Sequence, residues 1–138
     1  MAFEQTLTTS FKQDILLGVH DLETDTIKMA LYLATANLGA DTTIYTTTGE
    51  TSGTGYSAGG EVLTGVTVLT SGTTAYVDFA DPSWDPAVFT ARGALIYNAS
   101  KSNKAIAVLD FGSDKTATTI FTVQMPANTA TSALIRIA

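Results

Sequence analysis

The stretch EVLTGVTVLTSGTTAYVDF, residues 61–79, holds two runs in which apolar and polar side chains alternate, and Ser71 and Gly72 separate the runs. Alternation with a period of two places every second side chain on the same face of a strand. A two-residue loop that ends in Gly between two such runs is typical of a β-hairpin. This stretch therefore predicts that the chain folds as β-sheet.

Other apolar runs continue the pattern on both sides of the predicted hairpin. Upstream, residues 26–35 place Ile27, Met29, Leu31 and Leu33 on one face. Threonine, whose β-branched side chain favours strands, makes up 25 of the 138 residues. Downstream, turn residues separate further runs, which span residues 86–91, 93–100, 104–111, 116–124 and 132–138. We therefore expect an all-β fold, a single-domain β-sandwich or jelly roll of about eight or nine strands.

Residues 37–60 interrupt this regular spacing. The segment is dense in Thr, Ser and Gly, but Ile44, Tyr45 and Tyr56 give it apolar anchors. We interpret it as an ordered loop with a short strand, in which the glycines provide flexibility. Its length suits a Greek-key crossover better than a plain meander.

One short helix is expected near the start of the chain. Ser10 is a candidate N-cap with Gln13 as its capping-box partner, and Gly18 is a candidate stop. Phe11, Ile15 and Leu16 would form its apolar stripe. We divide the chain into an N-terminal arm, residues 1–9, and one domain, residues 10–138.

The net charge of the chain and its lack of Cys disfavour several kinds of partner and chemistry. The formal net charge is −6 and the seven basic residues are scattered, whereas a nucleic-acid or anionic-membrane partner calls for a basic patch. The chain has no Cys, so neither disulfides nor thiolate chemistry are available to it. Its start, MAFEQTLTTSFK, lacks the pattern of a secretory signal, so we expect synthesis in the cytoplasm.

The stretch VDFADPSWDP, residues 77–86, concentrates Asp78, Asp81, Asp85 and Trp84. We interpret it as a turn, because Asp-Pro pairs start turns and Pro is excluded from central strands. Trp84 would then fold back over the open end of the core. A calcium site built from the three aspartates is an alternative, although their spacing is not that of an EF-hand.

A weak repeat accompanies this turn. At an offset of 32 residues, VDFADPSWDPAVFTA (77–91) matches LDFGSDKTATTIFTV (109–123) at Asp-Phe and Phe-Thr. The parallel suggests two equivalent corners of a sandwich.

No residue pattern spells out a reaction. His20 is the only His, and without a nucleophile motif we interpret it as a capping or turn residue. Arg92 stands in an apolar stretch and is expected to pair with Asp78 or Asp110. We expect no enzyme activity, no cofactor and no metal, and a hydrolase that uses Asp78 or Asp110 is a remote alternative.

Several blocks together resemble a known family. They are SFKQDILLGVHDLETDTIKMALY (10–32), GTGYSAGG (53–60), VDFADPSW (77–84), ARGALIYN (91–98) and AVLDFGSDK (107–115). With them the chain resembles small virion proteins of tailed bacteriophages, most of all the capsid cement, or decoration, proteins with a jelly-roll fold. This resemblance implies a structural protein on the capsid exterior that binds the major capsid protein and itself, as a dimer or trimer. The family has no catalytic residues to carry over.

We expect exposed aromatic and basic side chains to make the partner contacts. The candidates are Phe3, Phe11, Tyr45, Tyr56, Trp84 and Arg92. An alternative is a phage tail or fibre module in which Trp84 and the loop tyrosines stack on a host-surface glycan.

Overall fold

The fold is described from a computed structural model of the chain, over residues 3–127, 129 and 131–137. It is an all-β sandwich with one short helix, as the sequence predicts. The elements in chain order are β1 (Thr6–Leu7), α1 (Thr9–Leu16), β2 (Ile27–Tyr32), β3 (Glu61–Val62), β4 (Thr67–Ser71), β5 (Thr74–Asp78), β6 (Ser83–Trp84), β7 (Phe89–Asn98), β8 (Lys104–Ala117), β9 (Phe121–Thr122) and β10 (Ile135–Ile137). Within the described ranges, no helix is both long and apolar enough to cross a bilayer.

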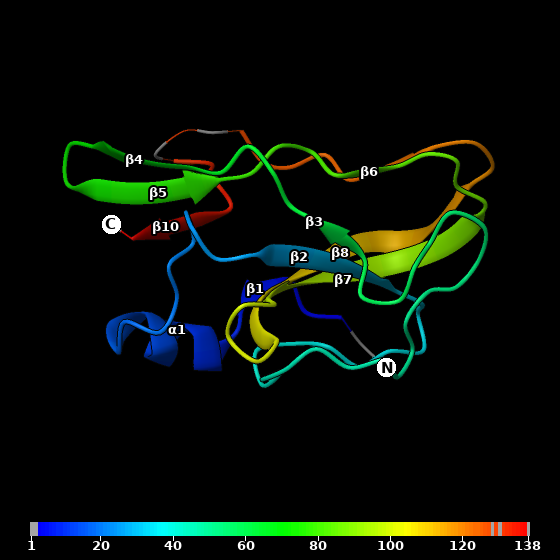
Figure 1. The fold of residues 1–138 in the computed structure, drawn as a ribbon, viewed down its shortest axis with the longest axis horizontal. Coiled ribbons are helices and arrows are strands. Elements are labelled where there is room, and N and C mark those ends of the chain that lie inside the picture. Colours follow the sequence, from blue (N-terminus) through cyan, green and yellow to red (C-terminus); the bar gives the residue numbers. More distant parts are fainter. Residues whose placement is uncertain (1–2, 128, 130, 138) are drawn as a thin grey trace.

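The strands form one large sheet and two small ones. The large sheet has the order β1-β8-β7-β2-β3, and the small sheets have the orders β10-β5-β4 and β6-β9. The longest ladder joins β7 to β8, from Phe89 opposite Ala117 to Asn98 opposite Lys104. In Figure 1, β4, β5 and β6 lie above the large sheet and the segment that follows β2 runs below it. The chain therefore crosses between layers rather than forming a plain meander.

Both faces of the large sheet are buried. Ile27, Met29 and Leu31 contribute to the cluster between the sheet and the layer above. On the opposite face, Tyr32 and Leu95 belong to a second buried cluster with four others of the sheet and two of the covering segment, namely Ala30, Tyr97, Ala105, Val108, Ala36 and Leu38. The alternation in residues 26–35 predicts one buried face correctly. It does not reveal the second face, because an irregular segment without strand periodicity covers that face.

One carboxylate, that of Glu50, joins three parts of the covering segment, residues 33–60. Glu50 Oε1 accepts a hydrogen bond from Tyr45 Oη at 2.6 Å, and Glu50 Oε2 accepts one from Gly59 N at 2.8 Å. Tyr56 Oη also donates to Glu50 and accepts from Leu31 N at 2.9 Å. Burial, and then the bond to Glu50, raise the pKa of Tyr45 and Tyr56 well above the ordinary value, so both hydroxyls stay protonated and donate.

The ordered loop is confirmed, but its short strand is not. The described segment contains no strand, and its β-pairing with its neighbours is limited to isolated bridges, such as Ile44 with Lys104. Ile44 is 51% exposed and is therefore not an anchor. The glycines do more than provide flexibility, because a Cβ on Gly60 would lie 1.8 Å from Met29 O, at a φ of +80°. Glycine here lets the segment approach β2 closely.

Helix α1 begins two residues earlier than expected. Thr8, not Ser10, is the N-cap, and its side chain accepts a hydrogen bond from Phe11 N at 3.2 Å. The helix stops at Gly18 as predicted, with φ +72° and a bond from Val19 N to Asp14 O that marks a Schellman motif. Leu16, however, is 87% exposed and does not belong to the buried stripe.

The predicted N-terminal arm is largely part of the sheet. β1 pairs antiparallel with β8, with Thr6 opposite Val108, and Phe3 forms a bridge with Leu38. Residues 3–9 therefore belong to the domain, because their backbone completes the sheet edge. Residues 1 and 2 lie outside the described residues.

The hairpin that predicts the fold is present with a shift of one residue. Ser71 pairs with Thr74, so its loop is Gly72-Thr73 rather than Ser71-Gly72. Gly72 has φ +59°, as the first central residue of a type II′ turn requires. The first run is also divided, because β3 joins the large sheet and only β4 enters the hairpin.

The repeat does not produce two equivalent corners. Asp78 ends β5, but Asp110 lies within β8, which continues to Ala117. The parallel holds only at Phe89 and Phe121, which each begin a strand and whose rings lie 5.2 Å apart. Trp84 does fold into the core near both rings.

We expect Glu50→Ala to lower the free energy of unfolding by about 3 kcal/mol, because it removes the acceptor of several partly buried donors. Glu50→Gln, which keeps one acceptor oxygen, should lose less. Urea unfolding followed by the fluorescence of Trp84, the only Trp, measures both changes. The control is Glu61→Ala, an exposed strand residue that should change stability by no more than about 0.5 kcal/mol. Equal losses for Glu50→Ala and Glu61→Ala would contradict this role of Glu50.

Candidate functional site

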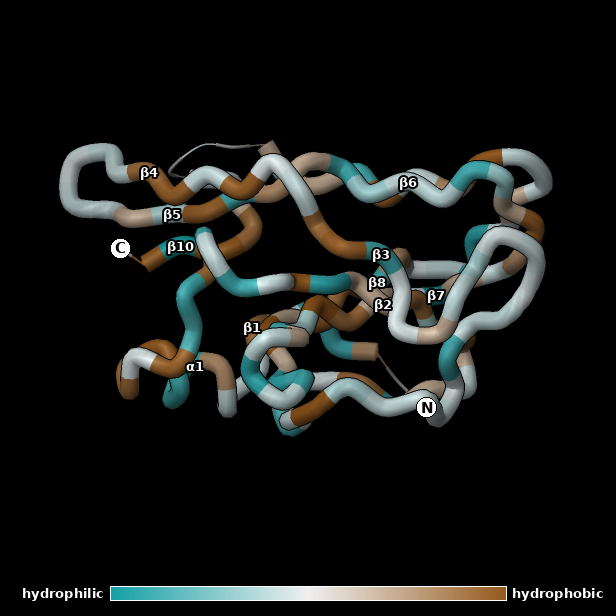
Figure 2. The backbone as a smooth tube through the Cα atoms, in the orientation of Figure 1, coloured by the Kyte–Doolittle hydropathy of each residue, from teal (hydrophilic) through white to brown (hydrophobic). Residues whose placement is uncertain are grey.

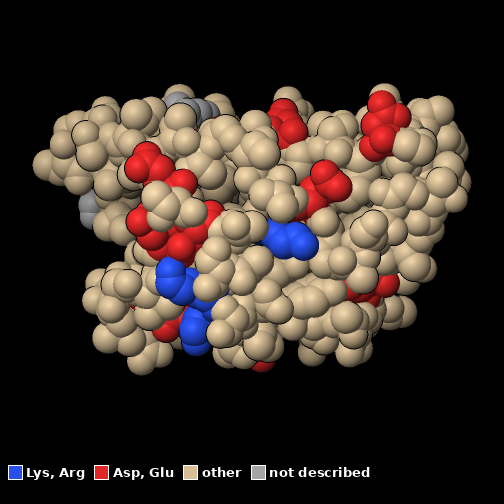
Figure 3. Space-filling view, viewed as in Figure 1, with Lys and Arg blue, Asp and Glu red and all other residues tan. Residues whose placement is uncertain are grey.

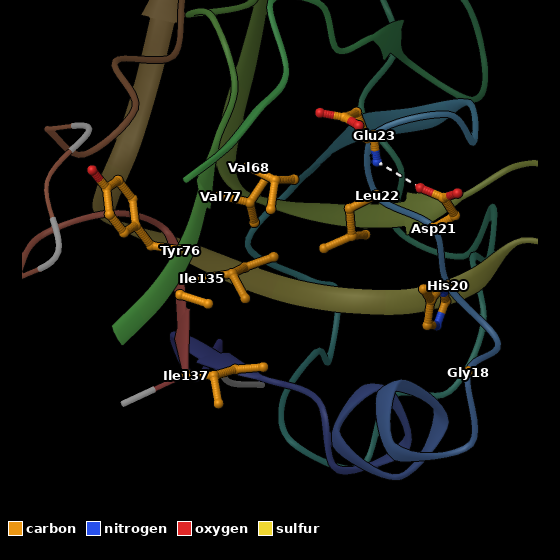
Figure 4. Close-up of a pocket in the computed structure, with 11 residues that line it drawn as sticks. Gly18, His20, Asp21, Leu22, Glu23, Val68, Tyr76, Val77, Ile135 and Ile137 are labelled. Carbon is orange, nitrogen blue, oxygen red and sulfur yellow. Dashed lines mark hydrogen bonds between the residues drawn. The ribbon is translucent and has the colours of Figure 1, made fainter. Parts of the chain in front are cut away.

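An apolar groove lies between the β10-β5-β4 sheet and the loop that follows α1. It has a volume of about 490 Å³. Figure 4 shows Val68, Val77 and Ile135 directed into it from the sheet and Leu22 from the loop. The remaining lining residues are Gly18, His20, Asp21, Glu23, Ala75, Tyr76 and Ile137.

The strand register builds the sheet wall. Val68 and Ile135 are both opposite Val77, on its two sides, so the three side chains form a row on one face. Val77 and Ile135 are buried, but Val68 is 47% exposed because no layer covers its end of the row. The groove is therefore open at β4.

A turn built on Asp21 shapes the opposite wall. Asp21 Oδ1 accepts hydrogen bonds from Glu23 N at 3.2 Å and Thr24 N at 3.3 Å. Such bonds from a side chain to the following backbone fix a turn, and Figure 4 draws the first of them. The turn directs Leu22 toward the groove and leaves the carboxylates of Asp21 and Glu23 at its rim.

A polar cluster of His20, Asp25, Asn98 and Lys101 joins this turn to the large sheet. Asn98 Nδ2 donates to Asp25 Oδ2 at 2.8 Å and contacts His20 Nδ1 at 3.0 Å. Lys101 Nζ donates to the same Asp25 oxygen at 2.9 Å. Because Asn98 Oδ1 accepts from Ser100 N, its amide nitrogen must face His20, so His20 Nδ1 is the acceptor and carries no proton. Sequence reasoning placed His20 in a cap or exposed turn, whereas the fold buries it.

This environment shifts the pKa of His20 and the pKa of Asp25. Burial lowers the pKa of His20 below the ordinary 6.5, although the carboxylates of Asp14 and Asp25 act in the opposite direction. Burial would raise the pKa of Asp25, but hydrogen bonds from Asn98, Asp21 N and Lys101 outweigh it and lower the pKa to about 2. The folded cluster therefore holds a neutral imidazole and a charged carboxylate.

Exposed apolar side chains surround the groove. Leu17, next to the lining residue Gly18, is 69% exposed, and Ile137 is 57% exposed. Figure 2 shows hydrophobic residues at the end of α1 and in β4 and β10, at the same end of the molecule. Figure 3 shows acidic side chains gathered over the segment that joins α1 to β2. An apolar groove with an acidic rim is suited to an apolar chain segment that carries Lys or Arg.

Two predicted contact residues are corrected. Phe11 and Trp84 are each only 2% exposed. Phe11 packs beside His20 with ring centroids 5.2 Å apart, and Trp84 packs against Phe121 at 6.0 Å. Neither side chain can reach a partner in this fold, because both are buried in the core.

The other predicted contact residues lie away from the groove. Phe3 is half-buried against Gly93, where a Cβ would meet its ring at 2.6 Å. Tyr45 stacks on Tyr97 with ring centroids 4.8 Å apart, and Tyr56 binds Glu50. Arg92 pairs with Asp110 at 3.5 Å, one of the two partners expected for it. Sequence reasoning missed Leu17, Val68 and Ile137, whose exposure no alternation pattern reports.

The aspartates of residues 77–86 do not form a metal centre. Asp81 Oδ1 accepts a hydrogen bond from Met125 N at 2.7 Å, so it ties the turn to the C-terminal segment. Burial raises the pKa of Asp78. In the part of the chain that the structure describes, no three His, Cys, Asp or Glu side chains form a group that could hold a metal ion.

No family model, no curated protein and no solved structure matches this chain. The chemistry of its own surface therefore carries the functional proposal.

Stability should fall in two steps as the pH decreases. Below pH 6.5 the unfolded chain binds a proton at His20 that the folded chain, with its lower pKa, does not bind. A second loss follows between the ordinary aspartate pKa of 3.8 and about 2, where Asp25 is protonated first in the unfolded chain. Urea midpoints measured across both windows check these losses. His20→Gln should remove the first loss and leave the second, whereas a wild-type midpoint that stays constant through the first window would contradict it.

Proposed function

We propose that this chain is a non-enzymatic structural protein of a tailed-phage virion that binds the outside of the capsid and cements neighbouring major capsid protein subunits. The observation that carries this proposal is the open apolar groove between the β10-β5-β4 sheet and the loop after α1. A binding protein needs such a surface, because burial of apolar area is the main favourable term in protein association.

The groove also brings together blocks that carry the resemblance to cement proteins. Residues 10–32 supply α1 and the loop wall, and residues 77–84 begin at Val77 in the sheet wall. The β-rich fold is compatible with a jelly roll. These blocks are distant in sequence and meet at one surface, which supports a shared binding role for them.

Rim charge defines the chemistry of the capsid segment that we propose to bind there. Asp21 and Glu23 line the groove, and the chain as a whole carries a formal charge of −6. A segment with apolar side chains for the groove and one or more Lys or Arg for the rim complements both features. Binding to the assembled lattice but not to free subunits would stabilise the shell by mass action.

The glycan-binding alternative depended on an exposed Trp84, and the structure does not support it. Stacking on a sugar requires an exposed ring, and Trp84 is buried. The ring of Tyr45 already stacks on Tyr97, and the ring of Tyr56 packs against Trp84 and Phe89. No other feature of the described surface favours a glycan.

We expect Leu17→Asp to weaken capsid binding by at least about tenfold, which corresponds to ~1.4 kcal/mol. The change places a charge next to the lining residue Gly18, where binding would bury apolar area. The measurement is cosedimentation of the purified protein with capsids of the phage that encodes it, prepared without this protein.

Ile120→Asp is the matched control. Ile120 is 53% exposed, comparable to Leu17, but it lies at the turn between β8 and β9, at the opposite end of the molecule from α1 (Figure 1). This variant should bind like the wild type. Equal weakening by the two variants, or a wild-type protein that sediments with isolated tails and not with capsids, would overturn the proposal.

A further inference from the structure

Strand β4 is an unprotected edge. It is the outer strand of the β10-β5-β4 sheet, and each of its five residues is exposed. Val68 is 47% exposed on the groove face and Leu69 is 44% exposed on the opposite face. Natural edge strands are commonly protected by charges, prolines or bulges, but residues 66–74, VTVLTSGTT, contain no charged residue and no Pro.

The register shows which backbone groups point outward from this edge. Ser71 and Thr74 close the two-residue loop, so they form a hydrogen-bonded pair, and Leu69 with Tyr76 forms the next one. The N–H and C=O groups of the alternate residues, Val68 and Thr70, therefore point away from β5. Within the described ranges, no hydrogen bond uses the backbone groups of Val68 or Thr70.

We propose that a second copy of this chain pairs with this edge, β4 antiparallel to β4, about a two-fold axis at Leu69. Val68 of each copy then lies opposite Thr70 of the other. Each of these two pairs exchanges two backbone hydrogen bonds, and the two Leu69 side chains meet between them as a non-hydrogen-bonded pair. The two three-stranded sheets join into one continuous sheet.

Charge and symmetry favour a second copy over a different partner. Copies that each carry a formal charge of −6 repel one another, so self-association is favoured where the contact surface is neutral. The sequence 66–74 provides such a surface. Pairing centred on Leu69 also matches every outward donor of Val68 and Thr70 with an acceptor of the same two residues, so the edge is self-complementary. This inference is independent of the capsid proposal, because it concerns the chain in solution.

Single-cysteine variants test the register, since the chain has no Cys of its own. In Leu69→Cys the two thiols lie on residues directly opposite, where Cα atoms are about 4.5 Å apart and a disulfide can form. In Ser71→Cys, a control on the same strand and face, each cysteine lies opposite Thr67 of the other copy, about 13 Å along the strand from its counterpart. We expect mild oxidation to cross-link Leu69→Cys much faster than Ser71→Cys. Equal rates, or a faster Ser71→Cys, overturn the proposal.

Sedimentation of the unmodified protein over a range of concentrations provides the second readout. We expect a reversible dimer that Leu69→Lys abolishes, because two lysines would lie directly opposite each other. Val88→Lys, at a residue 52% exposed outside the β10-β5-β4 sheet, is the control and should leave the dimer intact. A wild-type protein that stays monomeric, or a dimer that persists in Leu69→Lys, overturns the proposal.

Discussion

The carboxylate of Glu50 fixes the path of residues 33–60, because it accepts hydrogen bonds from Tyr45, Tyr56 and Gly59 within that segment. Backbone bonds, such as the one from Thr51 N to Leu31 O, join the segment to the sheet, where it covers the face that includes Tyr32 and Leu95. With that face covered, β2 and residues 93–98 of β7 are buried on both sides. The loop after α1 is bonded to this layer through Asn98 of β7, and the groove lies between that loop and the β10-β5-β4 sheet.

Local sequence patterns predicted the helix and the strands better than they predicted which segments pack against them. The all-β class, the strand at Ile27–Tyr32, the hairpin and the helix stop at Gly18 could all be predicted, because each depends on neighbouring residues. The cover over Tyr32 could not, because no local pattern shows which segment packs over a sheet face. For the same reason the groove was missed: β4 has the alternation of a half-buried strand, yet both of its faces are exposed.

The groove and the edge of β4 are two features of one small sheet. Val68 takes part in both, since its side chain lines the groove and its backbone lies at the free edge. A dimer through β4 would therefore place two grooves on one assembly, and each could receive a segment of a different capsid subunit. Two linked contacts bind more tightly than either alone, which is the physical requirement for cementing neighbours.

If, as we propose, a tailed phage encodes this chain, electron cryomicroscopy of its purified particles tests the proposed function most directly. We expect density for the chain repeated over the outside of the shell, at junctions between major capsid protein subunits, with the groove between the loop after α1 and the β10-β5-β4 sheet filled by a capsid segment. Density confined to the tail, or shell density in which the groove faces solvent, would contradict the proposed role.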